Sequence, residues 1–246
     1  MKKKKDSQQE MERLLADVLT EMPTSFKCGG KLFYIFPKSL GMFILINRLK
    51  RQLEFDKDNI KINPIMEAVR ICQTQKDVVL RMLCYATKSR KDDVFDEADN
   101  GERIAFFDEN LEEKELASLF LYIIEDENET IDKLKKYFKI DNEQRRKKKV
   151  AEVKNEKSKN ISFGGVSIFG TILDHFCSRY GMTKDDVVWG ISYINLMMMY
   201  YDEPDSTYIS DDEKKKLPAS VLTDSRDVID PYSEKGKERI KNMKWE

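Results

Sequence analysis

Hydrophobic residues recur every three or four positions along most of the chain, which is the spacing of one face of an α-helix. The first such pattern lies within residues 7–20 and ends before Pro23. Between Gly30 and Pro37, residues 31–36 are aromatic and β-branched, which predicts either a strand or half of a hairpin with residues 25–28. A second helical pattern comes after Pro37, with Leu40, Phe43, Ile44, Ile46, Leu49 and Leu53 as its apolar members.

Polar residues with capping side chains mark where further helices begin. Asn63 directly precedes Pro64, which suits the first helical position, and the predicted apolar face then contains Ile65, Val69 and Cys72. Capping-box spacing also precedes two later apolar runs, at Thr74 with Asp77 and at Asn110 with Glu113.

Charged segments interrupt this pattern. Residues 92–101 are polar and acidic and are expected to break it, and a short helix is expected at 130–138. Residues 141–160 contain the basic block 145–149 and few apolar residues, so they cannot bury a face. They are expected to form a charged linker or a solvated helix.

A second apolar unit begins at Ile161. Gly181 supplies a left-handed helix stop, and Thr183 with Asp186 has the spacing of a cap for the next helix. These signals predict a helical hairpin whose first face is formed by Ile168, Ile172, Leu173, Phe176 and Tyr180.

The predicted fold class is mainly α with a small N-terminal β element. Only 10 Gly and 6 Pro occur in 246 residues, which favours helices over a turn-rich β architecture. The expected organisation is an N-terminal helical extension at 1–22, an α-rich core domain at 23–140, a charged linker at 141–160, the helical hairpin at 161–202 and a mobile polar tail at 203–246.

Composition argues against several function classes. The 44 basic and 45 acidic residues give a net charge of −1, so no long-range field attracts nucleic acid or anionic lipid. His175 is the only histidine and the four cysteines form no CxxC pair, so a non-enzymatic protein without catalytic residues, cofactor or metal is expected. Residues 1–5 are basic but no apolar signal core comes after them, and no apolar run is long enough to span a membrane.

The segment 187–201 is apolar all around a helix. Either a fully buried central helix or a face left free for a partner protein would explain this pattern, and its methionines can repack against several apolar shapes. The candidate partner-binding residues are Trp189, Ile191, Tyr193, Ile194, Leu196, Met197, Met198, Met199, Tyr200 and Tyr201.

An alternative function uses residues 167–202 as a helix-turn-helix regulator of DNA. The second helix of such a unit would enter the major groove. Asp185 and Asp186 lie beside the single Lys184 in its first turn and would repel phosphate, so nucleic acid is not the expected partner.

Three stretches resemble a known family. Residues 173–181 (LDHFCSRYG) and 186–196 (DVVWGISYINL), with the glycine-led strand at 31–36 before Pro37-Lys38-Ser39-Leu40, resemble tail assembly chaperones of long-tailed bacteriophages and prophages. The resemblance implies a protein of the host bacterial cytoplasm that coats the apolar, helical tape-measure protein and keeps it soluble. It also implies the tail-tube protein as a second partner, is compatible with a homo-oligomer, and brings no catalytic residues.

A tape-measure protein is a long apolar helical chain, so its chaperone needs an apolar groove for helices and a charged outer surface. Residues 187–201 are expected to supply the groove.

Overall fold

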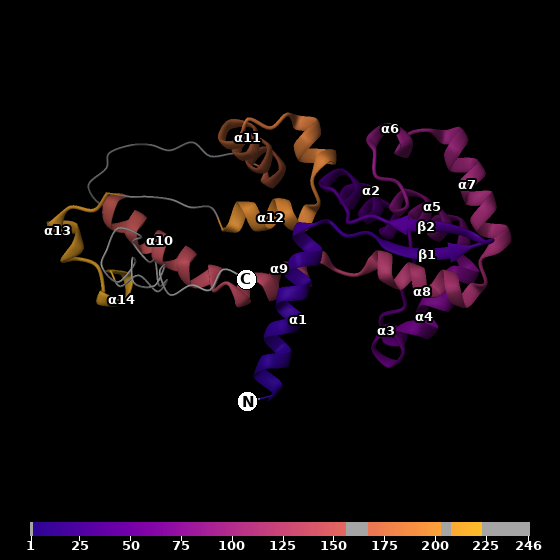
Figure 1. Ribbon diagram of the computed structural model, residues 1–246, viewed down its shortest axis with the longest axis horizontal. Helices are drawn as coiled ribbons and strands as arrows, with labels where there is room; N and C mark the ends of the chain where they lie inside the picture. The colour runs from indigo at the N-terminus through magenta and orange to yellow at the C-terminus, as the bar shows by residue number, and fades with distance from the viewer. Residues whose placement is uncertain (1, 156–166, 203–207, 223–246) are drawn as a thin grey trace, which may run out of the picture. The chain divides into compact units, whose positions relative to one another are not determined.

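The computed structural model describes residues 2–155, 167–202 and 208–222 (Figure 1). Two compact units divide the chain: unit 1 comprises Met1–Ile140 with Phe163–Glu203, and unit 2 comprises Asp141–Ser162 with Pro204–Glu246. Where the structure describes them, both units consist mainly of helices, and a two-stranded antiparallel sheet lies near the N-terminus of unit 1. The predicted fold class, mainly α with a small N-terminal β element, is confirmed.

Of the two alternatives for 31–36, the hairpin is present, and it begins the core of unit 1. Strand β1 (Thr24–Cys28) pairs antiparallel with β2 (Lys31–Ile35). Gly29 and Gly30 have φ values of +53° and +76°, the left-handed conformation that a tight hairpin turn requires at both central positions. Phe26 stacks on Phe33 across the strands at 5.6 Å, and both rings pack on Phe107.

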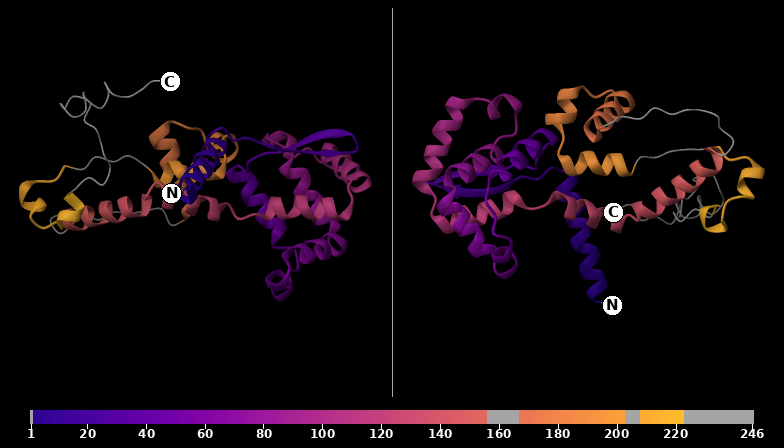
Figure 2. Two further views of the ribbon diagram at one scale, coloured as in Figure 1. Left: turned by 60° about the horizontal axis from the view of Figure 1, so that its bottom comes forward. Right: turned by 180° about the vertical axis from the view of Figure 1, so that it is seen from behind.

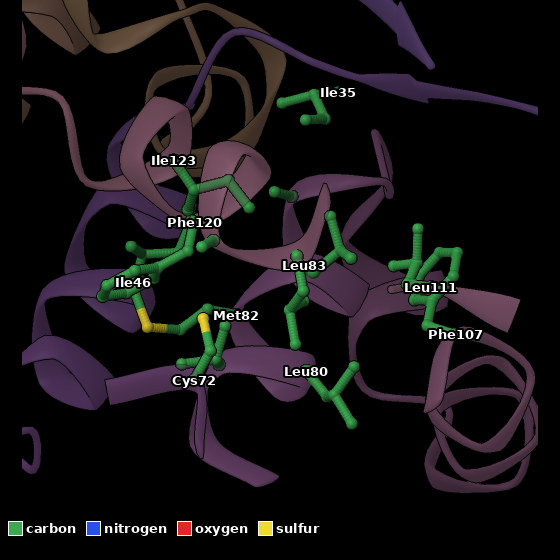
Figure 3. Close-up of a cluster of buried hydrophobic side chains, with 14 of the residues drawn as sticks. Ile35, Ile46, Cys72, Leu80, Met82, Leu83, Phe107, Leu111, Phe120 and Ile123 are labelled. Atoms are coloured by element: carbon green, nitrogen blue, oxygen red, sulfur yellow. The ribbon is translucent and has the colours of Figure 1, made fainter. Parts of the chain in front are cut away.

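The first core of unit 1 forms where helices pack around α5. Its largest buried members come from α2, α4, α5, α7 and α8, and Figure 3 shows Ile46, Leu83 and Phe120 among them. The helices along this part of the chain are α1 (Lys2–Leu19), α2 (Leu40–Lys50), α3 (Lys57–Ile62), α4 (Pro64–Thr74), α5 (Lys76–Ala86), α6 (Lys91–Val94), α7 (Glu97–Asn110), α8 (Glu113–Ile124) and α9 (Glu127–Tyr137).

The predicted cap at Asn63 is confirmed, but the predicted face of α4 is partly wrong. The Asn63 side chain accepts hydrogen bonds from the amides of Ile65 and Met66. Ile65 itself is exposed, and the charged Glu67 is buried in its place. The face that α4 buries is therefore set by its packing and by the partners of Glu67, not by apolar spacing alone.

Two predicted capping boxes are wrong. Thr74 is the last residue of α4, and its hydroxyl donates to the Arg70 carbonyl instead of capping α5. Asn110 is likewise the last residue of α7, and the capping box of α8 is made by Glu112 with Glu115. In both cases a polar side chain satisfies the end of the preceding helix.

Residues 92–101 do not break the helical pattern, so that expectation is also wrong. They contain most of α6 and the start of α7, where Asp96 caps the amides of Ala98 and Asp99. Acidic residues in a first helical turn are favoured by the helix dipole. The Lys88 ammonium is buried beneath this turn and donates to the Asp93 carbonyl at 2.7 Å.

The C-terminal part of unit 1 begins as predicted and then departs from prediction. Helix α11 (Ile168–Tyr180) ends at Gly181, whose φ is +64°. Thr183 and Asp186 exchange the capping hydrogen bonds that their spacing predicts. The prediction of a single helix over 187–201 is wrong. The π-helical turn η1 (Asp186–Gly190) is followed by extended residues and then by α12 (Tyr193–Tyr201).

The interruption between η1 and α12 has a clear cause. Ser192 pairs with Ser39 in an isolated antiparallel bridge, and the Tyr193 amide donates to the Lys38 carbonyl at 2.7 Å. The chain is therefore extended here because it pairs with the segment that leads into α2. The described residues of 161–202 pack with those of 23–140 inside unit 1, and α12 lies against α9 and α1.

Unit 2 contains α10 (Ile140–Asn155), α13 (Asp211–Lys214) and α14 (Ala219–Leu222). Of the two alternatives for 141–160, the described part is a helix. The Arg146 Nε donates to the Val221 carbonyl at 2.5 Å, and Leu217 and Val221 are buried. The remainder of the predicted tail at 203–246 lies outside the described residues. Across the described ranges, no helix is long and apolar enough to cross a bilayer.

Candidate partner-binding groove

The predicted partner-binding residues of 187–201, except Trp189, belong to a second core inside unit 1. They pack with Ile172, Phe176 and Val187, and Phe43 stacks on Tyr193 at 4.2 Å. Leu196 and Met197 are buried. The others are half-buried: Trp189, Ile191, Tyr193, Ile194, Met198, Met199, Tyr200 and Tyr201. This burial favours the central-core alternative for most of the segment over a free apolar face.

Ile194 nevertheless borders a cavity of about 250 Å³ in unit 1. We call it the α1 groove, because α1 forms one wall and the β2–α2 connection, the α8–α9 connection and α12 form the others. Its lining residues are Leu14, Asp17, Val18, Met22, Ile35, Phe36, Pro37, Lys38, Tyr122, Ile123, Glu125, Asp126, Glu127, Thr130, Ser192 and Ile194.

The floor of the α1 groove is apolar because α1 is amphipathic. Leu14 and Val18 are one turn apart on α1 and face the cavity together. Met22 lies just beyond the end of the helix and stays 62% exposed at the mouth of the groove. Tyr122 is fixed at the opposite side by a 2.6 Å hydrogen bond between its hydroxyl and that of Thr24.

The rim of the α1 groove is acidic, with four carboxylates and one ammonium among its lining residues. Lys38 pairs with Glu127 and also donates to the Glu125 carbonyl. Asp126 caps α9 through the Asn128 amide at 3.0 Å. The exposed carboxylates of Asp17 and Glu125 then have no cationic partner among the residues that line the groove.

Glu21, just beyond the end of α1, connects α1 to α12 by hydrogen bonds. Its φ of +51° ends α1, and its carboxylate accepts from the Ser192 amide at 2.8 Å and the Asn195 side chain at 3.0 Å. The Asn195 side chain also donates to the Val18 carbonyl at 2.8 Å. The two walls are therefore held by several polar contacts, which preorganises the groove for a ligand.

Trp189 and Ile191 line a second cavity of about 240 Å³ with Pro37, Met42 and Arg90. Trp189 is packed closely here: a methyl group at Gly41 would lie 2.8 Å from its ring. The Trp189 side of η1 therefore packs against α2.

Cys28 and Cys72 belong to the first core, Cys84 is buried in α5, and Cys177 packs against the second core. Burial raises the pKa of the Cys72 thiol to about 11 and also raises the pKa of Cys28 and Cys84. Such thiols are poor nucleophiles at neutral pH. Within the residues that the structure describes, no group of three or more His, Cys, Asp or Glu is placed to hold a metal ion.

Sequence reasoning found Ile194 but missed most of the groove. Asp17, Met22 and Glu125 lie far apart in the sequence, and only the fold brings them together. An available signal was the apolar Met22 beside Pro23, just beyond the end of an amphipathic helix.

Comparison with known protein families, curated protein sequences and solved structures finds no match for this chain. The resemblance to tail assembly chaperones therefore depends only on residues 31–40, 173–181 and 186–196, and the α1 groove is described from the geometry of this chain alone.

Proposed function

We propose that this chain is a non-enzymatic binding protein for apolar helical polypeptides, and that it acts as a tail assembly chaperone which keeps a phage tape-measure protein soluble. The observation that carries the proposal is the α1 groove, whose apolar floor is open at Met22. An amphipathic helix binds a protein by laying its apolar face into such a groove.

The groove has the features of a peptide site on a stable scaffold. Its walls come from separate helices fixed to one another by Glu21 and Asn195, so binding does not require those walls to be ordered first. Exposed apolar side chains at its edge, Met22 and Tyr122, would become covered by a bound helix. The resemblance supplies the particular partner, and the geometry supports the general class.

The helix-turn-helix alternative gains no support from the geometry. The element that comes after Gly181 is the short turn η1, and its Trp189 packs on α2. Asp185 and Asp186 are exposed where this turn begins. A duplex would meet carboxylates there, so we do not propose DNA binding.

A binding assay tests the proposal with one groove variant and one matched control. The probe is a fluorescein-labelled amphipathic peptide with leucine along one face, and its anisotropy is measured during titration with the full chain. Met22→Glu places a charge in the mouth of the groove and is expected to weaken binding about tenfold or more. Leu32→Glu changes an exposed apolar residue of β2 outside the lining and should leave the affinity unchanged.

Co-expression with a tape-measure protein tests the specific role. The wild-type chain should raise the soluble yield of that protein, and Met22→Glu should not. No peptide binding by the wild-type chain, or equal loss in both variants, would contradict the groove as the site.

A further inference from the structure

A second apolar surface of unit 1 lies at the junction of α3 and α4. Residues 56–66 are all exposed, and α3 buries none of its own residues. Ile62 is 82% exposed and Met66 is 65% exposed. We define the α3 tip as Ile60, Lys61, Ile62, Ile65 and Met66. Figures 1 and 2 show α3 at the edge of unit 1, joined to the body through α4.

The α3 tip is fixed by hydrogen bonds, although none of its five residues is buried. Asp56 caps α3 through the amides of Asp58 and Asn59, and Asn63 caps α4. The buried Glu67 accepts from the Asp56 amide at 2.7 Å and so ties the start of α3 to α4. Contiguous exposed apolar side chains rimmed by polar residues are a feature of protein interaction surfaces.

The charges of the α3 tip complement those of the α1 groove. Lys61 lies between Ile60 and Ile62, and Lys57 is exposed one turn earlier. Asp58, the acidic residue within α3, approaches Lys61 at 3.8 Å with both side chains in solvent. The α3 tip therefore presents four aliphatic side chains beside one exposed ammonium, that of Lys61, while Lys57 is flanked by the exposed carboxylates of Asp56 and Asp58. The groove presents an apolar floor beneath a rim where the carboxylates of Asp17 and Glu125 are exposed.

We propose that the α3 tip of one copy of this chain inserts into the α1 groove of a second copy. The contact is heterologous, because the two surfaces are different parts of unit 1. Each copy in a pair keeps one free tip or one free groove, so further copies add head to tail. Lys61 would meet the carboxylates of Asp17 and Glu125, and Ile62 would cover the floor beside Met22.

This self-association goes beyond the proposed function and would regulate it. A groove filled by a neighbouring copy is closed to a helical partner, so the two ligands compete for one site. In the absence of a partner, the chains would bury these apolar surfaces against one another. A partner helix would compete for the groove and shift the equilibrium towards dissociated chains by mass action.

Sedimentation velocity on the full chain tests the proposal. The sedimentation coefficient of the wild-type chain is expected to rise with concentration at low salt and to fall when salt is added. Ile62→Glu places a negative charge on the α3 tip, and Met22→Glu places one at the mouth of the α1 groove, so each variant should lose one of the two contact surfaces. Each variant alone should remain a monomer, with self-association at least about tenfold weaker than in the wild type.

Mixing the two variants distinguishes this geometry from other dimers. Ile62→Glu retains an intact groove and Met22→Glu retains an intact tip, so an equimolar mixture should form a dimer and nothing larger. In the same way, Lys61→Glu and Glu125→Lys should each weaken association, and their mixture should recover it, because Lys61 of the Glu125→Lys variant can meet Glu125 of the Lys61→Glu variant. Leu32→Glu is the control and should associate like the wild type.

A wild-type chain that stays monomeric at every concentration would overturn the proposal, as would a mixture that stays monomeric. Failure here is separate from failure of the proposed function. Peptide binding by a monomeric wild-type chain would leave the chaperone role standing without self-association. Self-association without any peptide binding would leave the tip contact standing without the chaperone role.

Discussion

Replacing Glu67 should loosen the α3 tip and destabilise unit 1. The Glu67 side chain is only 2% exposed, yet it is ionised and fully engaged. Its carboxylate accepts from Arg70 Nη2 at 2.6 Å and Nε at 2.9 Å, and from the Asp56 amide at 2.7 Å. Arg70 in turn donates to the Glu54 carbonyl at 2.6 Å. One carboxylate thus connects α4 to the segment that leads into α3.

The expected magnitude comes from these partners. A hydrogen bond to a charged group contributes about 1.5–3 kcal/mol, and three such bonds on one carboxylate are not additive. Arg70 is partly exposed and can turn to water after the loss of Glu67, which reduces the penalty. We expect Glu67→Ala to lower the free energy of unfolding by about 2–4 kcal/mol and Glu67→Gln by about half as much.

The effect should depend on pH in a defined direction. The hydrogen bonds from Arg70, assisted by the Asp56 amide, lower the pKa of Glu67 to about 2 from its ordinary 4.5, against the opposing effect of burial. A lowered folded-state pKa means that the carboxylate contributes fully above pH 4.5 and loses its contribution as the pH falls towards 2. The gap in stability between wild type and Glu67→Ala should therefore narrow below pH 4.5.

Urea denaturation monitored by circular dichroism measures this gap, and hydrogen exchange of residues 56–66 reports the tip directly. Glu102→Ala removes an exposed carboxylate and serves as the control, with an expected change within about 0.5 kcal/mol. A Glu67→Ala loss no larger than that of the control would refute the reasoning. So would a gap that is unchanged between neutral pH and the acid range.

Further predictions concern packing and thiol reactivity. Gly41→Ala should destabilise by about 1–3 kcal/mol and shift the emission of Trp189, because the new methyl meets its ring. Gly101→Ala, in α7 with no atom near the added methyl, should instead stabilise by about 0.5–1 kcal/mol in the same denaturation assay. Cys72 should resist alkylation at neutral pH until the chain unfolds, whereas the half-buried Cys177 should react first in mass-spectrometric labelling.

The features that the sequence predicted well are those that a few neighbouring residues determine. The turn at Gly29 and Gly30, the cap at Asn63 and the left-handed stop at Gly181 each depend on the conformational freedom or hydrogen bonding of one or two side chains. No distant contact is needed to form them, so their signals survive without knowledge of the fold.

Helix boundaries were harder to predict where one polar side chain could serve either of two helix ends. Thr74 bonds back to Arg70 and leaves α5 uncapped by any side chain. Asn110 donates to the Phe106 carbonyl at the end of α7. Sequence spacing does not show whether such a side chain caps the next helix or instead donates to a backbone carbonyl at the end of the preceding one. The two hydrogen bonds are of similar free energy.

The segment 187–201 shows why hydrophobic excess is a weak guide to a binding surface. Apolar residues all around a helix predict either a buried helix or one with a face free to bind a partner. The outcome depends on how much of the helix the rest of the chain packs against. Here the pairing of Ser192 with Ser39 breaks the segment, and α1, α9 and α11 cover most of α12. Exposed apolar side chains lie elsewhere in unit 1, among them Met22 just beyond the end of α1 and Ile65 in α4. Periodic spacing did not single them out, because the exposure of an apolar side chain depends on which other elements the fold places over it.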